Sequence, residues 1–280
     1  MITGTTQLLG VIGHPIEHSL SPVMHNAAIA ALGINAVYLP LPVSPADLPA
    51  AIAGFRAIGL RGFNVTIPHK QAIMPLLSEM TDLAQAVGAV NTVYPTEQGW
   101  GGTNTDVEGF IAPLKALRNW QQSIAVVLGG GGAARAVLAG CQHLGCSHIR
   151  VVGRNPEKLQ QFHQLSTATT IVSVHPWETL PELLIDADLL VNTTPIGMFP
   201  DLEASPLSLA DLASLKSGAI AYDLIYNPRP TQFLQYAQSQ GATPIDGLEM
   251  LVQQGAAALR LWLQQPVPVD IMRRSLLEQL

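Results

Sequence analysis

A run of four glycines between an apolar stretch and a helical pattern constrains the fold of this chain more than any other feature. The segment VVLGGGGAARAV places Gly129, Gly131 and Ala134 in the spacing G-x-G-x-x-A. In this spacing the first glycine makes a tight turn, the second lets a pyrophosphate approach the backbone, and the small third residue allows close helix–strand packing. The N–H groups and dipole at the helix start then hold the phosphate charge. The pattern predicts a dinucleotide site; a glycine-rich turn without a ligand is the alternative.

Apolar strand patterns alternate with helical patterns in the first part of the chain. This alternation predicts a mostly parallel sheet with helices on both faces. The expected strands are residues 5–13, 36–43 and 63–67, and the expected helices are residues 22–33, 45–59 and 69–80.

A second unit begins near Asn104. It contains a helical stretch at residues 105–120, the strand–turn–helix of residues 123–145, and strand-then-loop segments at residues 148–155, 187–198 and 218–228. Residues 247–265 form an apolar-striped helix pattern without a strand partner, which we interpret as a return to the first domain. We therefore expect an α/β fold in two domains. Residues 1–104 and 244–280 would form a discontinuous α/β substrate domain, and residues 105–243 a Rossmann-type, doubly wound dinucleotide-binding domain.

Composition limits the classes of function. A chain of 280 residues suits two domains better than one core. No apolar run approaches the ~18 residues of a membrane span, and the net charge of -6 argues against nucleic acid as a partner. The two cysteines, Cys141 and Cys146, cannot build a disulfide framework or a four-thiolate zinc site. We expect a cytoplasmic protein with a small-molecule task.

The residues after the second strand of the dinucleotide unit indicate which nicotinamide cofactor binds. A site for NAD usually places Asp or Glu there, on the ribose 2′-hydroxyl. This chain has Gly153, Arg154 and Asn155, and Glu157 lies further into the following helix. Arginine can pair bidentately with a 2′-phosphate, and Lys158 would add charge. We predict NADP; ordinary surface cations are the alternative.

Two serines precede the first helix. Ser19 and Ser21, two residues apart near a helix start, suit a carboxylate ligand, although one of them could simply cap the helix. The neighbouring His14, His18 and His25 match no zinc spacing, so we expect no metal.

Polar side chains also follow the strand at residues 63–67 and two later segments. They are Asn64, Thr66, Lys70, Asn91, Asn104, Thr105 and Asp106. The carboxyl end of a parallel strand is the ligand edge of an open sheet. Lys70 and Asp106 could form a proton-transfer pair there; a surface ion pair is the alternative.

Eight segments together resemble the shikimate dehydrogenase family, whose members interconvert 3-dehydroshikimate and shikimate with NADPH. In chain order they read GHPIEHSLSPVMHNAA, NVTIPHK, GAVNT, NTDVEGF, VLGGGGAARA, NTTPIGM, DLIYNPRPTQFL and DGLEMLVQQGA. The match runs nearly end to end, and its ordered set of motifs is far more specific than the glycine turn alone.

The resemblance implies a role for each matching residue. Ser19, Ser21 and Tyr226 would bind the substrate carboxylate. Thr66, Asn91 and Gln254 would bind ring hydroxyls. Lys70 would be the catalytic acid/base, with Asp106 as its partner and a further substrate contact. On the cofactor side, the implied residues are Gly129, Gly130, Gly131, Gly132 and Ala133 for the pyrophosphate, Gly153, Arg154, Asn155 and Lys158 for the 2′-phosphate and adenine, Thr193, Thr194, Leu224 and Gly247 towards the nicotinamide, and Asp82.

Two positions depart from the family pattern. The usual Asn-Arg-Thr turn reads Gly153-Arg154-Asn155, with Lys158 in place of a later arginine, so one side-chain donor is lost at Gly153. Gly130 replaces the usual alanine, which adds entropy to the unfolded chain more than it changes chemistry. The alternative functions are a quinate/shikimate dehydrogenase and a non-catalytic NADP-sensing relative. A monomer and a homodimer both remain open.

Overall fold

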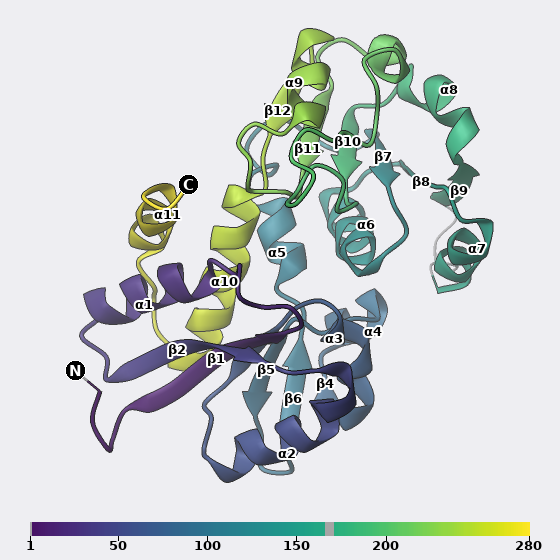
Figure 1. Cartoon of the computed structure of the whole chain (residues 1–280). Coiled ribbons are helices and arrows are strands. Elements are labelled where there is room, and N and C mark those ends of the chain that lie inside the picture. Colours follow the sequence, from purple (N-terminus) through teal and green to yellow (C-terminus); the bar gives the residue numbers. More distant parts are fainter. Residues whose placement is uncertain (1, 166–170) are drawn as a thin grey trace. The chain divides into compact units, whose positions relative to one another are not determined.

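The computed structural model describes residues 2–165 and 171–280, and the side chains of residues 158, 161 and 163–165 also lie outside the description. The chain divides into two compact units, each with its own six-stranded sheet (Figure 1). Unit 1 comprises Met1–Gly109 and Leu251–Gln279, and unit 2 comprises Phe110–Met250 with Leu280. The predicted α/β class is confirmed in both units.

The sheet of unit 1 has the strand order β2-β1-β3-β5-β6-β4. Its strands are β1 (Gln7–Gly13), β2 (Ala36–Pro42), β3 (Phe63–Val65), β4 (Glu79–Met80), β5 (Thr92–Pro95) and β6 (Trp100–Thr103). β1 pairs in parallel with β2 and β3, and β4 with β6, so the sheet is mostly parallel, as predicted. β5 is an exception that the sequence analysis missed, because it runs antiparallel to both β3 and β6. Residues 96–99 between β5 and β6 are long enough only for a hairpin.

The helices of unit 1 are shorter than the sequence pattern suggested. They are α1 (Ser21–Ala31), α2 (Leu48–Ala57), α3 (His69–Ala72), α4 (Asp82–Val87), α5 (Asp106–Ile111), α10 (Leu248–Leu263) and α11 (Val269–Leu277). Two 3₁₀ turns, η1 (Pro45–Asp47) and η2 (Met74–Leu76), lie between them. Helices α5 and α10 continue across the boundaries between the units. The helix expected over residues 69–80 ends at Ala72, and the stretch expected over 105–120 ends at Ile111. Pro75 and Pro113 follow closely in these two places, and proline cannot donate the helical hydrogen bond.

Apolar side chains cover both faces of this sheet. On the α2 side, Phe63 packs edge-on against Phe55 and Trp100 with ring centroids 5.3 and 5.2 Å apart. On the other side, Trp262 of α10 donates its indole N–H to the carbonyl of Val93 over 2.9 Å. α11 packs against α1 (Figure 1). The last helices of the chain therefore complete the core that the first residues begin.

The sheet of unit 2 is entirely parallel, in the order β12-β11-β10-β7-β8-β9. Its strands are β7 (Ile124–Leu128), β8 (His148–Gly153), β9 (Val172–Pro176), β10 (Leu189–Asn192), β11 (Ile220–Asp223) and β12 (Thr243–Ile245). Its helices are α6 (Gly132–Leu144), α7 (Pro156–Leu165), α8 (Leu180–Leu184) and α9 (Gln232–Ser239), with 3₁₀ turns η3 (Trp177–Thr179) and η4 (Asp211–Ser214). Counted from β7, the strand order is 3-2-1-4-5-6, the doubly wound arrangement predicted from the glycine turn.

The central strands of unit 2 are buried along almost their whole length. Residues 125–128 of β7 and 189–192 of β10 are all buried, and only Ile124 at the start of β7 is partly exposed. Such uninterrupted apolar runs are typical of parallel strands covered on both sides. The edge strands β9 and β12, which were not among the predicted strands, are less buried. Within residues 2–165 and 171–280, no helix is long and apolar enough to cross a membrane.

The burial of His25 on α1 leads us to expect that the protein becomes less stable as the pH falls below about 6.5. Its ring stacks on Tyr38 with centroids 4.0 Å apart, and burial lowers the pKa of His25 from 6.5 to about 4. Between these two pH values the unfolded chain binds a proton that the folded chain excludes, so the free energy of unfolding falls as the pH falls through this window. At 1.4 kcal/mol per pKa unit the loss reaches about 3 kcal/mol.

The variant His25→Phe removes this proton, so its unfolding free energy should fall less than that of the parent protein between pH 7 and pH 4.5. Urea titrations of both proteins at the two pH values measure the difference. If the unfolding free energy fell equally in the two proteins, His25 would not be the group responsible for this pH dependence.

Candidate active site

Lys70 and Asp106 form an ion pair in unit 1. Lys70 lies on the single-turn helix α3, which follows β3, and Asp106 is the first residue of α5. Lys70 Nζ donates to Asp106 Oδ2 over 2.6 Å, and the two side chains keep 22% and 10% of their surface exposed. Charge-assisted hydrogen bonds of this length are among the stronger polar contacts in proteins. The pair is therefore held together while part of the lysine side chain stays exposed.

Asp106 is fixed on both carboxylate oxygens and on its backbone. Its Oδ1 accepts a hydrogen bond from Asn91 Nδ2 over 2.8 Å, and its N–H donates to Asn104 Oδ1 over 3.0 Å. Asn104 in turn donates to the carbonyl of Ala89 over 2.9 Å. Because these groups are buried, moving the carboxylate would leave polar atoms unpaired at considerable cost. Lys70 thus has one rigid partner and two further N–H donors for other acceptors.

Asn91 connects three segments of unit 1 that are far apart in sequence. Its amide nitrogen also lies 3.0 Å from Thr105 Oγ1 and 3.4 Å from Gln254 Oε1, and its Oδ1 accepts from the N–H of Thr105 over 2.7 Å. Gln254 lies on α10, so this helix brings a residue from late in the sequence next to Asn91. Thr92 donates to Asn91 Oδ1 over 3.0 Å; its contribution was missed by the sequence analysis, although its place directly after Asn91 was a signal.

Asn64 and Thr66 lie at and just beyond the end of β3. Asn64 is buried; its Oδ1 accepts from the hydroxyl of Tyr38 over 2.7 Å, and its Nδ2 donates to the carbonyl of Asn91 over 3.1 Å. Asn64 therefore supports Asn91 from the interior. Thr66 is only partly buried, and its methyl group lies so close to Gly13 that a Cβ at that glycine would be 2.6 Å away.

Ser19 and Ser21 stand at the start of α1, and both are partly exposed. The residue that caps α1 is Leu20, and no side chain makes the capping hydrogen bond. The N–H of Ser21 points to Ser19 Oγ at 3.4 Å, a long contact. The alternative that one serine serves as the helix cap is therefore wrong, and the two hydroxyls remain for another role.

No group of three or more His, Cys, Asp or Glu side chains with the arrangement of a metal site occurs among the described residues. Asp82, an implied cofactor residue, is the exposed first residue of α4 in unit 1. It belongs to a different unit from the glycine turn.

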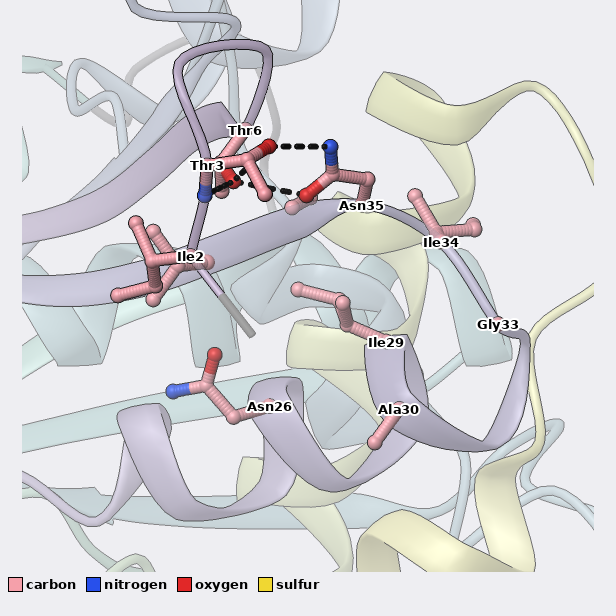
Figure 2. A pocket seen from close by; sticks show the side chains of 11 residues that line it. Ile2, Thr3, Thr6, Asn26, Ile29, Ala30, Gly33, Ile34 and Asn35 are labelled. Carbon is pink, nitrogen blue, oxygen red and sulfur yellow. Dashed lines mark hydrogen bonds between the residues drawn. The ribbon is translucent and has the colours of Figure 1, made fainter.

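A separate hollow of about 400 Å³ lies in unit 1 between α1, the start of β2 and the N-terminal segment (Figure 2). Its polar groups bond to each other: Thr6 Oγ1 donates to Asn35 Oδ1 over 2.7 Å, and the N–H of Thr3 donates to Thr6 Oγ1 over 2.8 Å. None of the predicted site residues lines this hollow, and none of its lining residues carries a charged side chain.

The glycine turn in unit 2 joins β7 to α6. Gly129 has a φ of +103°, and a Cβ there would lie 2.9 Å from Thr193 Oγ1, so both conformation and space require glycine. At Gly131 and Gly132, by contrast, a Cβ would meet nothing within 4 Å. The turn therefore leaves open space directly before the N–H groups of α6, whose first turn includes Ala133. A pyrophosphate fits this space and this charge.

A cavity of about 200 Å³ lies beside the turn. Six of the implied cofactor residues line it: Gly129, Gly130, Gly153, Arg154, Asn155 and Thr194. A Cβ on Gly153 would lie 3.0 Å from Leu159 Cδ2, so a larger residue at that position would have to displace Leu159. Lys158 is on α7, and its side chain lies outside the described part of the chain.

The loops after β10 and β11 are joined by a buried pair that the sequence analysis missed, Asn192 and Asp223. Asn192 Nδ2 donates to Asp223 Oδ1 over 3.1 Å, and Asn192 Oδ1 accepts from both the N–H and the hydroxyl of Thr194, over 3.0 and 2.7 Å. Burial raises the pKa of Asp223 to about 6, although hydrogen bonds from Thr231, Ile225 and Asn192 oppose this shift. The pair fixes the loops that carry the implied nicotinamide-side residues. A polar residue ending each of two buried strands was the available signal.

Three other implied residues follow β11. Leu224 and Tyr226 lie in the loop after Asp223, and both are partly exposed. A Cβ on Gly247 would lie only 2.1 Å from the carbonyl oxygen of Leu224, so this close approach requires glycine. The strand order reverses between β7 and β10, which makes this the switch point of the sheet. There Thr193 Oγ1 donates to the carbonyl of Leu128 over 2.6 Å, which ties the β10 loop to β7. Strand ends at such a switch point are where open parallel sheets bind ligands.

Comparisons with known proteins agree with this chemistry. The family described as the shikimate dehydrogenase substrate binding domain matches residues 11–93, and the shikimate 5′-dehydrogenase C-terminal domain matches residues 247–277. The shikimate dehydrogenase (NADP(+)) of Trichormus variabilis (strain ATCC 29413 / PCC 7937) is 62% identical over 286 residues, covering 100% of this chain and 99% of the relative.

Two solved structures extend the likeness to the fold. Shikimate dehydrogenase from Aquifex aeolicus is 38% identical with a TM-score of 0.88, and the match covers 99% of each chain. Shikimate 5-dehydrogenase from Thermus thermophilus, in complex with NADP(H) and shikimate, is 35% identical with a TM-score of 0.87, covering 98% of this chain and 100% of that one. A likeness of this extent, over the full length and through both units, shows that the chain belongs to the NADP-dependent shikimate dehydrogenase family.

Proposed function

We propose that this protein catalyses the NADP-dependent interconversion of 3-dehydroshikimate and shikimate, a step towards chorismate and the aromatic amino acids. The observation that carries the proposal is the Lys70–Asp106 pair, in which a buried amide holds the carboxylate while the lysine side chain keeps 22% of its surface exposed. A protein that only bound these molecules would have no need of such a pair.

The reaction requires a proton on the substrate oxygen and a hydride on the carbon next to it. NADPH, when bound, supplies the hydride. Lys70 supplies the proton: as negative charge develops on the oxygen of 3-dehydroshikimate, the ammonium group donates to it, and in the reverse direction the neutral amine accepts the proton of the hydroxyl. Asp106 holds Lys70 in place throughout. One carboxylate oxygen accepts from Lys70, and Asn91 fixes the other oxygen.

The other substrate contacts are proposed on the family resemblance, with support from the positions of the residues. Ser19 and Ser21 offer two hydroxyls that are not used as a helix cap, and these would bind the substrate carboxylate with Tyr226. Thr66, Asn91 and Gln254 would bind the ring hydroxyls. Support comes from the 3.4 Å contact between Asn91 and Gln254 and from the position of Thr66 at the end of β3.

The cofactor would occupy unit 2, and the substrate would be held mainly by unit 1. Open space before α6 and the cavity beside Arg154 support pyrophosphate and 2′-phosphate binding, respectively. The domain roles proposed for residues 1–104 with 244–280, and for residues 105–243, follow the same division. Asp82 and Lys158 remain proposed cofactor residues on the family resemblance alone.

We place the protein in the cytoplasm, as a monomer or a homodimer. The free cysteines Cys141 and Cys146 are both buried, which suits a reducing compartment. Sedimentation analysis would separate the two oligomeric states.

Replacing Lys70 by alanine should affect the chemical step more than binding. If Lys70 moves the proton, its contact is strongest in the transition state, so kcat should fall by ~10²–10⁴-fold while KM for shikimate changes little. Steady-state kinetics with shikimate and NADP⁺ measure both constants. The exposed Lys115→Ala variant removes the same charge away from the pair and should behave as the parent.

A large rise in KM with kcat within a few-fold of the parent would show that Lys70 only binds a ring hydroxyl. The catalytic assignment would then be dropped.

Replacing Arg154 by alanine should weaken NADP binding selectively. The loss of a charged hydrogen bond to the 2′-phosphate amounts to about 1.5–3 kcal/mol, and NAD, which lacks that phosphate, should be almost unaffected. Calorimetric titration of the variant and the parent with each cofactor measures the loss of affinity for NADP and for NAD separately. Equal losses for NADP and NAD would count against the 2′-phosphate site.

A further inference from the structure

Trp177 lies beside Arg154 in the cavity next to the glycine turn. It is the first residue of η3, directly after β9, and it lines the same cavity of about 200 Å³. The guanidinium carbon of Arg154 sits over the indole ring, 4.6 Å from its centroid. Neither the residue patterns nor the family resemblance assigns Trp177 a role.

An aromatic ring can hold an arginine without using its hydrogen-bond donors. The ring face attracts the cation, while the N–H groups at the guanidinium edge remain for other acceptors. Arg150, on strand β8 just before Arg154, shows the opposite arrangement: both of its terminal nitrogens donate to the carboxylate of Asp186. Among the ion pairs of the described residues, none involves Arg154. Its charge is therefore held in place but not neutralised.

The space around Gly153 explains why this support is needed. The family pattern has an asparagine there, whereas a Cβ at Gly153 would approach Leu159 Cδ2 to 3.0 Å. The side-chain donor that would normally share the phosphate with Arg154 is absent, so recognition depends more heavily on the arginine itself. A freely rotating arginine loses side-chain entropy when it binds, and an arginine already resting on a ring loses less.

We propose that Trp177 is a specificity-determining positioning residue, whose indole ring orders Arg154 for a phosphomonoester on the ribose of an adenine nucleotide. The inference rests on the proposed NADP function and extends it to a residue outside the phosphate-binding turn. Trp177 acts through Arg154, so its effect should appear only with ligands that carry the 2′-phosphate.

A purely structural role is the competing explanation, because Trp177 also packs against the hydrophobic core of unit 2. Two substitutions separate the explanations. Trp177→Leu keeps apolar bulk but removes the aromatic face, and Trp177→Phe keeps a smaller face. Thermal melting of both variants checks that they fold.

The experiment measures calorimetric binding of two fragments, adenosine 2′,5′-bisphosphate and adenosine 5′-monophosphate, to the full-length protein. Trp177→Leu should weaken the bisphosphate about 5- to 30-fold, the range of a partly desolvated cation–π contact, and the monophosphate less than about 2-fold. Trp177→Phe should lie between the parent and Trp177→Leu. Arg118→Ala, which removes the other arginine stacked on a tryptophan in unit 2 (Trp120), should leave both affinities unchanged.

The double variant Arg154→Ala/Trp177→Leu decides the mechanism. If Trp177 acts through Arg154, the double variant should bind the bisphosphate no more weakly than Arg154→Ala alone. Additive losses, or equal losses for the two fragments, would overturn the proposal and make Trp177 a general stacking or packing residue.

Failure of the underlying function would look different. The parent protein would then show no preference for the bisphosphate over the monophosphate, and it would not oxidise shikimate with NADP⁺.

Discussion

The side-chain amide of Asn91 is the contact on which the arrangement of unit 1 depends. Its nitrogen and oxygen reach Thr105 just before α5, Asp106 at the start of α5, and Gln254 on α10. An amide can donate and accept at once, so it can join a carboxylate to a hydroxyl and a backbone N–H in a way that no apolar residue could. Buried polar networks of this kind specify one arrangement, because partial satisfaction is costly. Because Asp106 is fixed by this network, the position of the Lys70 ammonium group that is hydrogen-bonded to it is fixed as well.

The elements that were predicted correctly are those whose sequence signals lie within a short stretch of chain. The glycine turn, the buried strands β7 and β10, and helix α1 with Pro22 at its start all carry their signals within a short stretch of chain. Antiparallel β5 was missed although its hairpin with β6 is local; only its pairing with β3 depends on a more distant part of the sequence. The helix expected after Lys70 failed for a similar reason: the local signal, Pro75, was present but was outweighed by an apolar pattern that continues past it.

The site shows the same division. Lys70 and Asp106 were recognisable as residue types in uncharged loops, but their 2.6 Å contact is a tertiary result. Asn192 and Asp223 escaped notice because each, taken alone, is simply a polar residue ending a strand. Only the pairing of β10 with β11 brings them together and shows that they fix Thr194 and the loop after Asp223. Trp177 was missed because its neighbour Arg154 follows a different strand, so that their contact is also a tertiary result.

Two different physical constraints act on the glycines of the turn. Gly129 is demanded by the folded chain, since its φ of +103° and the hydroxyl of Thr193 leave no room for a side chain. Gly131 and Gly132 face open space, so the fold alone would tolerate other small residues there, and a pyrophosphate bound as proposed would be what excludes them. A lineage that lost the need for the cofactor would therefore let the later glycines drift while retaining the first. Substitution at Gly131 or Gly132 alone would therefore indicate loss of cofactor binding, whereas substitution at Gly129 would indicate loss of stability.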